Sequence, residues 1–122
     1  SDPALALVAT GFGYGSQRRA AQAQLLTKLL PEVRDIRRIG AAALDLCRVA
    51  EGTVDAYFEH GINAWDFAAG AIIAREAGAV VHHPGLDKGS AQGELTWAAG
   101  ADLAPAFEKL LAAHGATDAL RG

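Results

Sequence analysis

The sequence predicts an α/β fold, a layered domain with a mostly parallel sheet flanked by helices. Short runs of apolar or β-branched residues alternate along the chain with longer segments whose apolar residues recur at helical spacing. Glycine or proline follows most of these segments, as expected where an element ends. Such alternation is typical of strand–helix–strand units, whose strands run in parallel. The length of 122 residues, of which 51% are hydrophobic, predicts one domain over residues 1–122.

Five strands and four helices are expected. We predict strands at residues 5–9, 33–39, 54–59, 79–82 and 95–99, and helices at residues 16–30, 41–51, 63–77 and 103–114. Pro31, Gly52 and Gly78 follow the first three helices and end them, because proline lacks the amide that a helix needs and glycine adopts the left-handed cap conformation. Pro105 is tolerated in the first turn of the last helix. The tail beyond Gly115 is expected to fray.

The composition excludes several classes of function. The formal net charge is −3 and no basic run occurs, so nucleic acid is not an expected partner. No apolar run approaches the ~20 residues of a membrane span, and no signal peptide is recognisable. Cys47 is the only cysteine, which fits a reducing compartment, so we expect a cytoplasmic protein without a membrane partner. Because Ser1, not Met, begins the chain just before the first strand, we expect a piece of a longer protein.

Glu59 and Asp66 flank a turn at Gly61, between the third strand and the third helix. Open α/β sheets bind ligands at the carboxyl ends of their strands, so both carboxylates are expected to face that edge. Two interpretations stay open. Asp66 could offer an oxygen to a hard cation at the helix N-terminus, or it could complete a capping box with Asn63, three residues before it. The residues alone favour capping.

Free backbone amides are expected where the second helix begins, at Gly40, Ala41 and Ala42. The first amides of a helix have no partner within the helix, and the helix dipole favours negative charge there. These amides could therefore bind an anion or a hydroxyl group, or they could only contact water.

Two further patterns are less specific. Gly11 and Gly13 match the first half of a dinucleotide-binding GxGxxG motif, but Ser16 stands in place of the third glycine, so a plain strand-to-helix turn is favoured. His82 and His83 are adjacent at a strand end and point to opposite faces, which disfavours a shared metal ion.

Several blocks of the sequence resemble the inositol monophosphatase family. The segment Trp65-Asp66-Phe67-Ala68-Ala69-Gly70, followed by Glu76-Ala77-Gly78, is similar to that family's C-terminal signature, WDxAAGxxIxxEAGG. Other blocks occur in the family's order, at residues 10–12, 37–40, 43–46 and 55–59. The departures, at Gly13, Ala79 and His82-His83, do not fall on the family's ligand positions.

The resemblance implies a Mg²⁺-dependent, lithium-sensitive phosphomonoesterase that acts on a sugar or inositol phosphate, usually as a homodimer. In that family the aspartate of the Trp-Asp pair is a metal ligand of the catalytic site, a role that carries over to Asp66. The glutamate that closes the preceding strand contacts a substrate hydroxyl, which carries over to Glu59. The turn that opens the earlier helix lines the substrate pocket, which carries over to Gly40, Ala41 and Ala42.

The resemblance also implies that the chain is the C-terminal half of such an enzyme. The family's other metal ligands lie in an N-terminal half, on a DPxDGT-type motif and an upstream glutamate, and neither occurs here. We therefore expect the chain to be inactive alone and to need the missing half as a partner. The alternatives are a related phosphatase acting on fructose bisphosphate, histidinol phosphate or a phosphoadenosine nucleotide, and a non-catalytic binding or dimerisation module.

Overall fold

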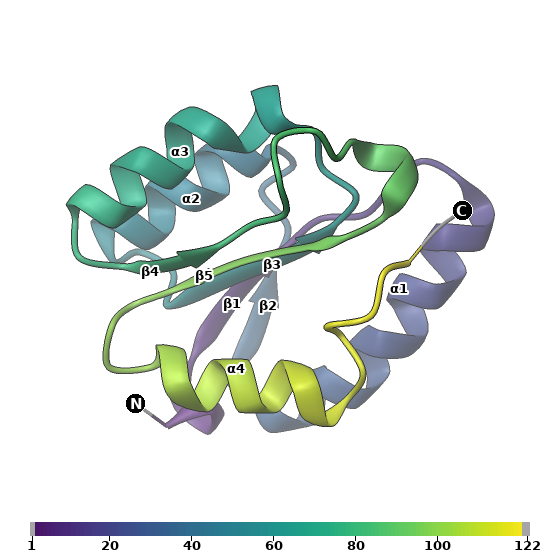
Figure 1. Cartoon of the computed structure of the whole chain (residues 1–122). Helices are drawn as coiled ribbons and strands as arrows, with labels where there is room; N and C mark the ends of the chain where they lie inside the picture. Colours follow the sequence, from purple (N-terminus) through teal and green to yellow (C-terminus); the bar gives the residue numbers. More distant parts are fainter. Residues whose placement is uncertain (1, 121–122) are drawn as a thin grey trace.

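A five-stranded sheet forms the centre of the computed structural model, which describes residues 2–120 (Figure 1). The strands are β1 (Leu7–Thr10), β2 (Asp35–Arg37), β3 (Ala56–His60), β4 (Val80–His82) and β5 (Leu95–Ala99). Their order across the sheet is β2-β1-β3-β5-β4. β1 pairs in parallel with β2 and β3, whereas β5 pairs antiparallel with β3 and β4. The predicted α/β fold is confirmed, and the sheet is mixed because β5 lies between two strands that run the opposite way.

Four helices cover the sheet on both faces (Figure 1). They are α1 (Ser16–Leu29), α2 (Ala42–Glu51), α3 (Ala64–Glu76) and α4 (Ala104–Ala113). Helices α2 and α3 pack side by side on one face, and α1 and α4 lie on the other. Within residues 2–120, none of these helices has both the length and the hydropathy that crossing a membrane requires.

Alternate residues of the central strands build two separate cores. Val8, Phe58 and Trp97 belong to the core beneath α1 and α4. Ala9 and Tyr57, each one position away, belong to the core beneath α2 and α3. This follows from the two-residue period of a strand, which sends successive side chains to opposite faces. Strand β3 is therefore buried on both faces, and its carboxyl end is held firmly in place.

The predicted boundaries shift by a few residues. The first strand begins at Leu7, because Asp2 accepts a hydrogen bond from the amide of Ala4 and starts a short 3-10 turn over Pro3–Leu5. The predicted strand at 33–39 is reduced to Asp35–Arg37 at the sheet edge, where pairing exists on one side only. Ser1, named above as the start of the chain, lies outside the described residues.

The prediction of a frayed tail is wrong for residues 116–120. Ala116 is fully buried, and its carbonyl accepts a hydrogen bond of 2.6 Å from Nε2 of the buried His60. Arg18 donates from Nε to the carbonyl of Leu120 at 2.6 Å, and the amide of Leu120 donates to the carbonyl of Gly93. The tail thus satisfies polar groups of distant segments, which composition alone could not indicate.

Gly70 allows α2 and α3 to approach closely. A Cβ atom at this position would lie 2.9 Å from Cβ of Leu46 on α2 and 3.3 Å from the carbonyl oxygen of Ala43. Both neighbours belong to or adjoin backbone, so they cannot move aside without shifting the helix. The fold of the α2–α3 layer therefore depends on a missing side chain at this position.

We predict that Gly70→Ala lowers the free energy of unfolding by about 1–3 kcal/mol, because the added methyl group overpacks the contact between α2 and α3. This loss should exceed the gain in helix propensity of about 1 kcal/mol that alanine normally brings. Urea unfolding followed by circular dichroism measures the change. Ala69→Ser, on the exposed face of the same helix, is the control and should change stability by no more than about 0.5 kcal/mol. Equal stability of Gly70→Ala and the unmodified chain would contradict this account of the packing.

A candidate active-site cleft at the carboxyl ends of β1, β2 and β3

A cleft of about 480 Å³ opens where the three mutually parallel strands end. Its walls are the loop after β1, the turn between β2 and α2, and the segment that joins β3 to α3. Five residues predicted from the sequence as site residues line it together: Gly40, Ala41, Ala42, Glu59 and Asp66. They come from two segments that are separate in sequence, the β2–α2 turn and the β3–α3 connection, and parallel pairing of the strands brings both to one edge. The chemical role of each stays a prediction.

Glu59 lies near the end of β3, half-buried in the floor of the cleft. The phenolic hydroxyl of Tyr57 donates a hydrogen bond to Oε1 of Glu59 at 2.7 Å. Burial raises the pKa of the Glu59 carboxyl, while the bond from Tyr57 and the positive charge of Arg38 act in the lowering direction. A buried carboxylate of this kind is a strong acceptor for a hydroxyl group, because few water molecules compete with it.

Asp66 lies in the first turn of α3 with an exposed side chain. The favoured capping interpretation is wrong, because neither half of the capping box forms. Asn63 occupies the N-cap position, but its Oδ1 accepts a hydrogen bond of 2.7 Å from the amide of Ser90 instead of an amide of α3. Within residues 2–120 no donor contacts the Asp66 carboxylate, so both of its oxygens are available to a ligand in the cleft.

The start of α2 also faces the cleft. Gly40 has a φ of +100°, a left-handed conformation that turns the chain from the end of β2 into the helix. Ala41 is the N-cap residue and has no side chain that could cap the first amides. Because α3 likewise lacks a side-chain cap, two helix N-termini with free amides border one cleft. Such an edge favours a bound anion.

Asp45 is a buried carboxyl group that sequence reasoning did not single out. It lies in the first turn of α2 and is 1% exposed, and neither of its oxygens has a hydrogen-bond partner among residues 2–120. Burial and, to a smaller extent, the negative charge of Glu59 raise its pKa to about 7, even though the positive charge of Arg38 acts in the lowering direction. Its position in an otherwise apolar helical stripe was the only signal in the sequence that could have drawn attention to it.

We predict that the stability of the protein depends on pH through Asp45. Its pKa in the folded state lies above the unfolded value near 3.9, so the folded state holds a proton that the unfolded state loses. The associated stability is present below about pH 4 and is lost as the pH rises through about 7. Asp45→Asn removes this dependence, and its stability relative to the unmodified chain should rise by about 2–3 kcal/mol between pH 5 and pH 8. Urea unfolding at both pH values measures the difference; an equal difference at pH 5 and pH 8 would exclude Asp45 as the cause.

Two arginines, Arg18 and Arg38, line the cleft. The guanidinium group of Arg38 lies 5.8 Å from the ring centroid of Phe12. Arg18 is buried, donates from Nη2 to the carbonyl of Ser90 at 2.6 Å, and passes beside Gly61, where a side chain would overlap its guanidinium group. The positive charge of Arg38 offsets part of the negative charge of Glu59.

The adjacent histidines His82 and His83 do not line the cleft. The ring of His82 meets Trp97 edge-on on one side of the sheet, and the ring of His83 stacks near Phe67 on the other, as strand alternation predicts. Among the residues that the structure describes, no three side chains of His, Cys, Asp or Glu are grouped to hold a metal ion. Asp66 is therefore at most one member of a larger set of ligands.

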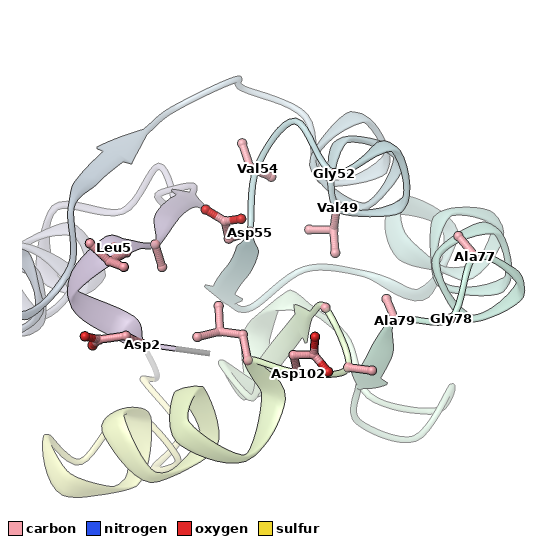
Figure 2. Close-up of a pocket in the computed structure, with 14 residues that line it drawn as sticks. Asp2, Leu5, Val49, Gly52, Val54, Asp55, Ala77, Gly78, Ala79 and Asp102 are labelled. Atoms are coloured by element: carbon pink, nitrogen blue, oxygen red, sulfur yellow. The ribbon is translucent and has the colours of Figure 1, made fainter.

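A second hollow, of about 500 Å³, lies at the opposite edge of the sheet, where β1, β3 and β4 begin (Figure 2). Three of its lining residues are acidic: Asp2, Asp55 and Asp102. Asp2 accepts a hydrogen bond from the amide of Ala4, and Asp55 accepts one of 2.7 Å from the amide of Leu7. These two carboxylates thus satisfy backbone groups at the start of the fold, and none of the predicted site residues lies here.

The sequence and the structure of this chain are similar to those of known proteins. The profile of the inositol monophosphatase family matches residues 3–119. Inositol-1-monophosphatase of Mycobacterium leprae is 63% identical over 83 residues, which are 68% of this chain and 28% of that protein. The Nus factor SuhB of Pasteurella multocida is 48% identical over 81 residues, 66% of this chain and 30% of that protein.

Solved structures give the same result. Mycobacterium tuberculosis SuhB superposes with a TM-score of 0.81 and 47% identity, covering 93% of this chain and 43% of that one. The inositol monophosphatase of Anabaena superposes with a TM-score of 0.77 and 32% identity, covering 93% of this chain and 45% of that one. The class is thus an α/β protein with a mixed sheet flanked by helices. The chain belongs to the inositol monophosphatase family, and it spans less than half the length of these relatives.

Proposed function

We propose that this chain forms the C-terminal part of a Mg²⁺-dependent phosphatase that hydrolyses a phosphate monoester of inositol or a related sugar. The observation that carries the proposal is the meeting of Glu59, Asp66 and the uncapped start of α2 in one cleft. Family membership and the inositol-1-monophosphatase of Mycobacterium leprae, at 63% identity, support it. A role in a homodimer, a cytoplasmic location and sensitivity to lithium belong to the same proposal.

Asp66 is the residue of this chain that would hold the metal ion. Its carboxylate is exposed, lines the cleft and has no hydrogen-bond donor among residues 2–120, and carboxylate oxygen suits a hard cation. When bound, Mg²⁺ supplies charge neutralisation at the phosphate and activation of water. Because Mg²⁺ takes six oxygen ligands in octahedral geometry, a single carboxylate does not complete its site. The remaining protein ligands would come from the part of the relatives' length that lies beyond this chain.

The other cleft residues would bind the substrate. Glu59 accepts a hydrogen bond from a hydroxyl group of the sugar, and the amides at Gly40, Ala41 and Ala42 contact its oxygen atoms. With the ester held this way, water attacks phosphorus, the bond from phosphorus to the alcohol oxygen breaks, and the alcohol and inorganic phosphate are the products. Positioning accounts for much of the rate in such reactions, so a rigid floor formed by β3 suits the task.

A binding role without catalysis is the second candidate. Apolar side chains are exposed on α2 and α3, among them Leu44, Trp65 and Ile72, which are 51%, 80% and 61% exposed. Exposed apolar side chains on two neighbouring helices favour association with another protein or another segment. A relative named Nus factor SuhB is consistent with a function beyond hydrolysis. Related phosphatase substrates, namely fructose bisphosphate, histidinol phosphate and phosphoadenosine nucleotides, remain alternatives within the enzymes.

We predict that the 122-residue chain alone releases no phosphate from inositol 1-phosphate with Mg²⁺, because Asp66 alone cannot form the metal site. A chimaera in which this chain replaces the matching segment of Mycobacterium tuberculosis SuhB should be active, since the two are 47% identical. Phosphate release measured with and without Mg²⁺ tests both statements. Turnover by the isolated chain would contradict the first, and an inactive but folded chimaera would contradict the second.

Sedimentation of the isolated chain with and without Mg²⁺ tests the binding role.

In the active chimaera, we predict that Asp66→Asn lowers kcat/KM by about 100-fold or more, because the amide is a poor ligand for Mg²⁺. Stability should change by less than about 1 kcal/mol, since only the interaction of the charge with the helix dipole is lost. Asp102→Asn, the same substitution at the opposite edge of the sheet, is the matched control and should leave activity unchanged. Retained activity in Asp66→Asn would remove Asp66 from the metal site.

A further inference from the structure

Tyr57 directs a buried hydroxyl group at the cleft residue Glu59. The two residues are two apart on β3, so their side chains point to the same face of the sheet. Tyr57 is fully buried, and its hydroxyl donates to Oε1 of Glu59 at 2.7 Å. No residue among 2–120 donates a hydrogen bond to the other oxygen, Oε2. Oε1 of Glu59 is thus bound by the Tyr57 hydroxyl, and Oε2 is available to a ligand in the cleft.

Gly11 constrains the same carboxylate from the neighbouring strand. In the parallel pairing of β1 with β3, Thr10 lies beside Phe58, and Gly11 therefore follows at the level of Glu59. The Thr10 hydroxyl donates to the carbonyl of Phe58 at 2.7 Å and fastens the two strands just before this point. A Cβ atom on Gly11 would overlap Oε1 of Glu59, its nearest neighbour, and would lie 2.6 Å from Cδ and 2.8 Å from Oε2. The carboxylate fits only because position 11 has no side chain.

We propose that Tyr57 is a positioning residue that determines which substrate hydroxyl the cleft selects, by holding the Glu59 carboxylate against Gly11 in one orientation. The inference rests on the proposed function for the identity of the ligand, a polyol phosphate. Without the phenolic hydroxyl, the Glu59 side chain could rotate about its terminal bond and offer either oxygen in several directions. With it, a single oxygen is presented in one direction, so only a hydroxyl at the matching ring position is bound well.

The surroundings keep Tyr57 in the form that this role requires. Burial and the negative charges of Glu59, Asp45 and Asp66 hold the pKa of its phenol well above the usual range. The phenol therefore stays protonated and remains a donor at neutral pH, and it does not compete with the carboxylate as a second anion. Phenylalanine has nearly the same shape, so removal of the hydroxyl leaves the packing in the core beneath α2 and α3 intact.

Substrate selectivity in the chimaera tests the proposal. Inositol 1-phosphate and its monodeoxy analogues, each lacking one hydroxyl, are compared by kcat/KM. The analogue for which kcat/KM of the unmodified protein falls most, relative to inositol 1-phosphate, identifies the hydroxyl that Glu59 binds. The ratio of these two kcat/KM values is the discrimination. For Tyr57→Phe, we expect this discrimination to fall about 10-fold, mainly through KM of the parent substrate, with kcat for the deoxy analogue unchanged. In a Glu59→Gln background, Tyr57→Phe should have no further effect on selectivity.

Two further variants separate positioning from loss of structure. Gly11→Ala displaces only the end of a flexible side chain, so it should fold normally and lose the same discrimination as Tyr57→Phe. Phe58→Leu alters the neighbouring residue of β3 on the opposite face and should lower stability without changing selectivity. If Phe58→Leu reduces the discrimination as much as Tyr57→Phe does, the effect is structural and the proposal is overturned.

A readout without substrate completes the test. In the 122-residue chain labelled with ¹³C at tyrosine Cζ, the Tyr57 resonance is assigned with Tyr57→Phe and should shift in Glu59→Gln. An unchanged resonance shows that the hydrogen bond is absent and overturns the positioning role. A chimaera that hydrolyses no phosphate monoester overturns the proposed function, and the selectivity role falls with it, whatever the resonance shows. Selectivity unaffected by Tyr57→Phe in an active chimaera overturns the positioning role alone.

Discussion

The parallel pairing of β1 with both β2 and β3 is the constraint on which the rest of the structure depends. It aligns the carboxyl ends of three strands, so that the loops leaving them border one cleft. The helices that follow two of these strands, α2 and α3, then begin at the cleft with unpaired amides. The fold therefore delivers two helix N-termini and the acidic side chains of β3 and α3 to one place, before any ligand is considered.

The site is built at a cost to stability. Asp45, Tyr57 and Glu59 place three ionisable groups in or near the core beneath α2 and α3, where charge is poorly solvated. The pKa values of Asp45 and Glu59 are both raised, and burial is the largest cause of each shift. Burial therefore makes the charged form of each group less favourable in the folded protein. Binding and catalytic sites commonly hold ionisable groups in this way, because fixed groups need no reorganisation when a ligand binds. Strand β3 also contributes apolar side chains to the cores on both faces of the sheet, which favours folding.

The mixed sheet explains why the cleft is confined to one side of the molecule. Strand β5 runs against β3 and β4, so its own carboxyl end lies at the far edge, close to the hollow shown in Figure 2. There the carboxylates of Asp2 and Asp55 bind backbone amides and stabilise the start of β1. The C-terminal tail returns to the cleft side, where Arg18 and His60 hold it. The two edges of the sheet thus differ: one carries carboxylates that bind backbone amides, and the other carries the candidate site.

The sequence by itself determined the α/β class, the order of the helices and strands, and the residues that resemble the inositol monophosphatase signature, because periodicity and local motifs are properties of neighbouring residues. It also predicted that Glu59 and Asp66 face the carboxyl edge of the sheet, because both lie where a strand ends and a helix begins, and the structure places both at that edge. Only the tertiary structure decided that Asn63 binds Ser90 instead of capping α3, that Asp45 is buried without a partner, and that Tyr57 and Gly11 hold Glu59 between them. Each of these features depends on which distant segment of the chain lies beside the residue. Contacts between distant segments do not produce a periodic pattern of residue types, so the sequence alone could not predict them.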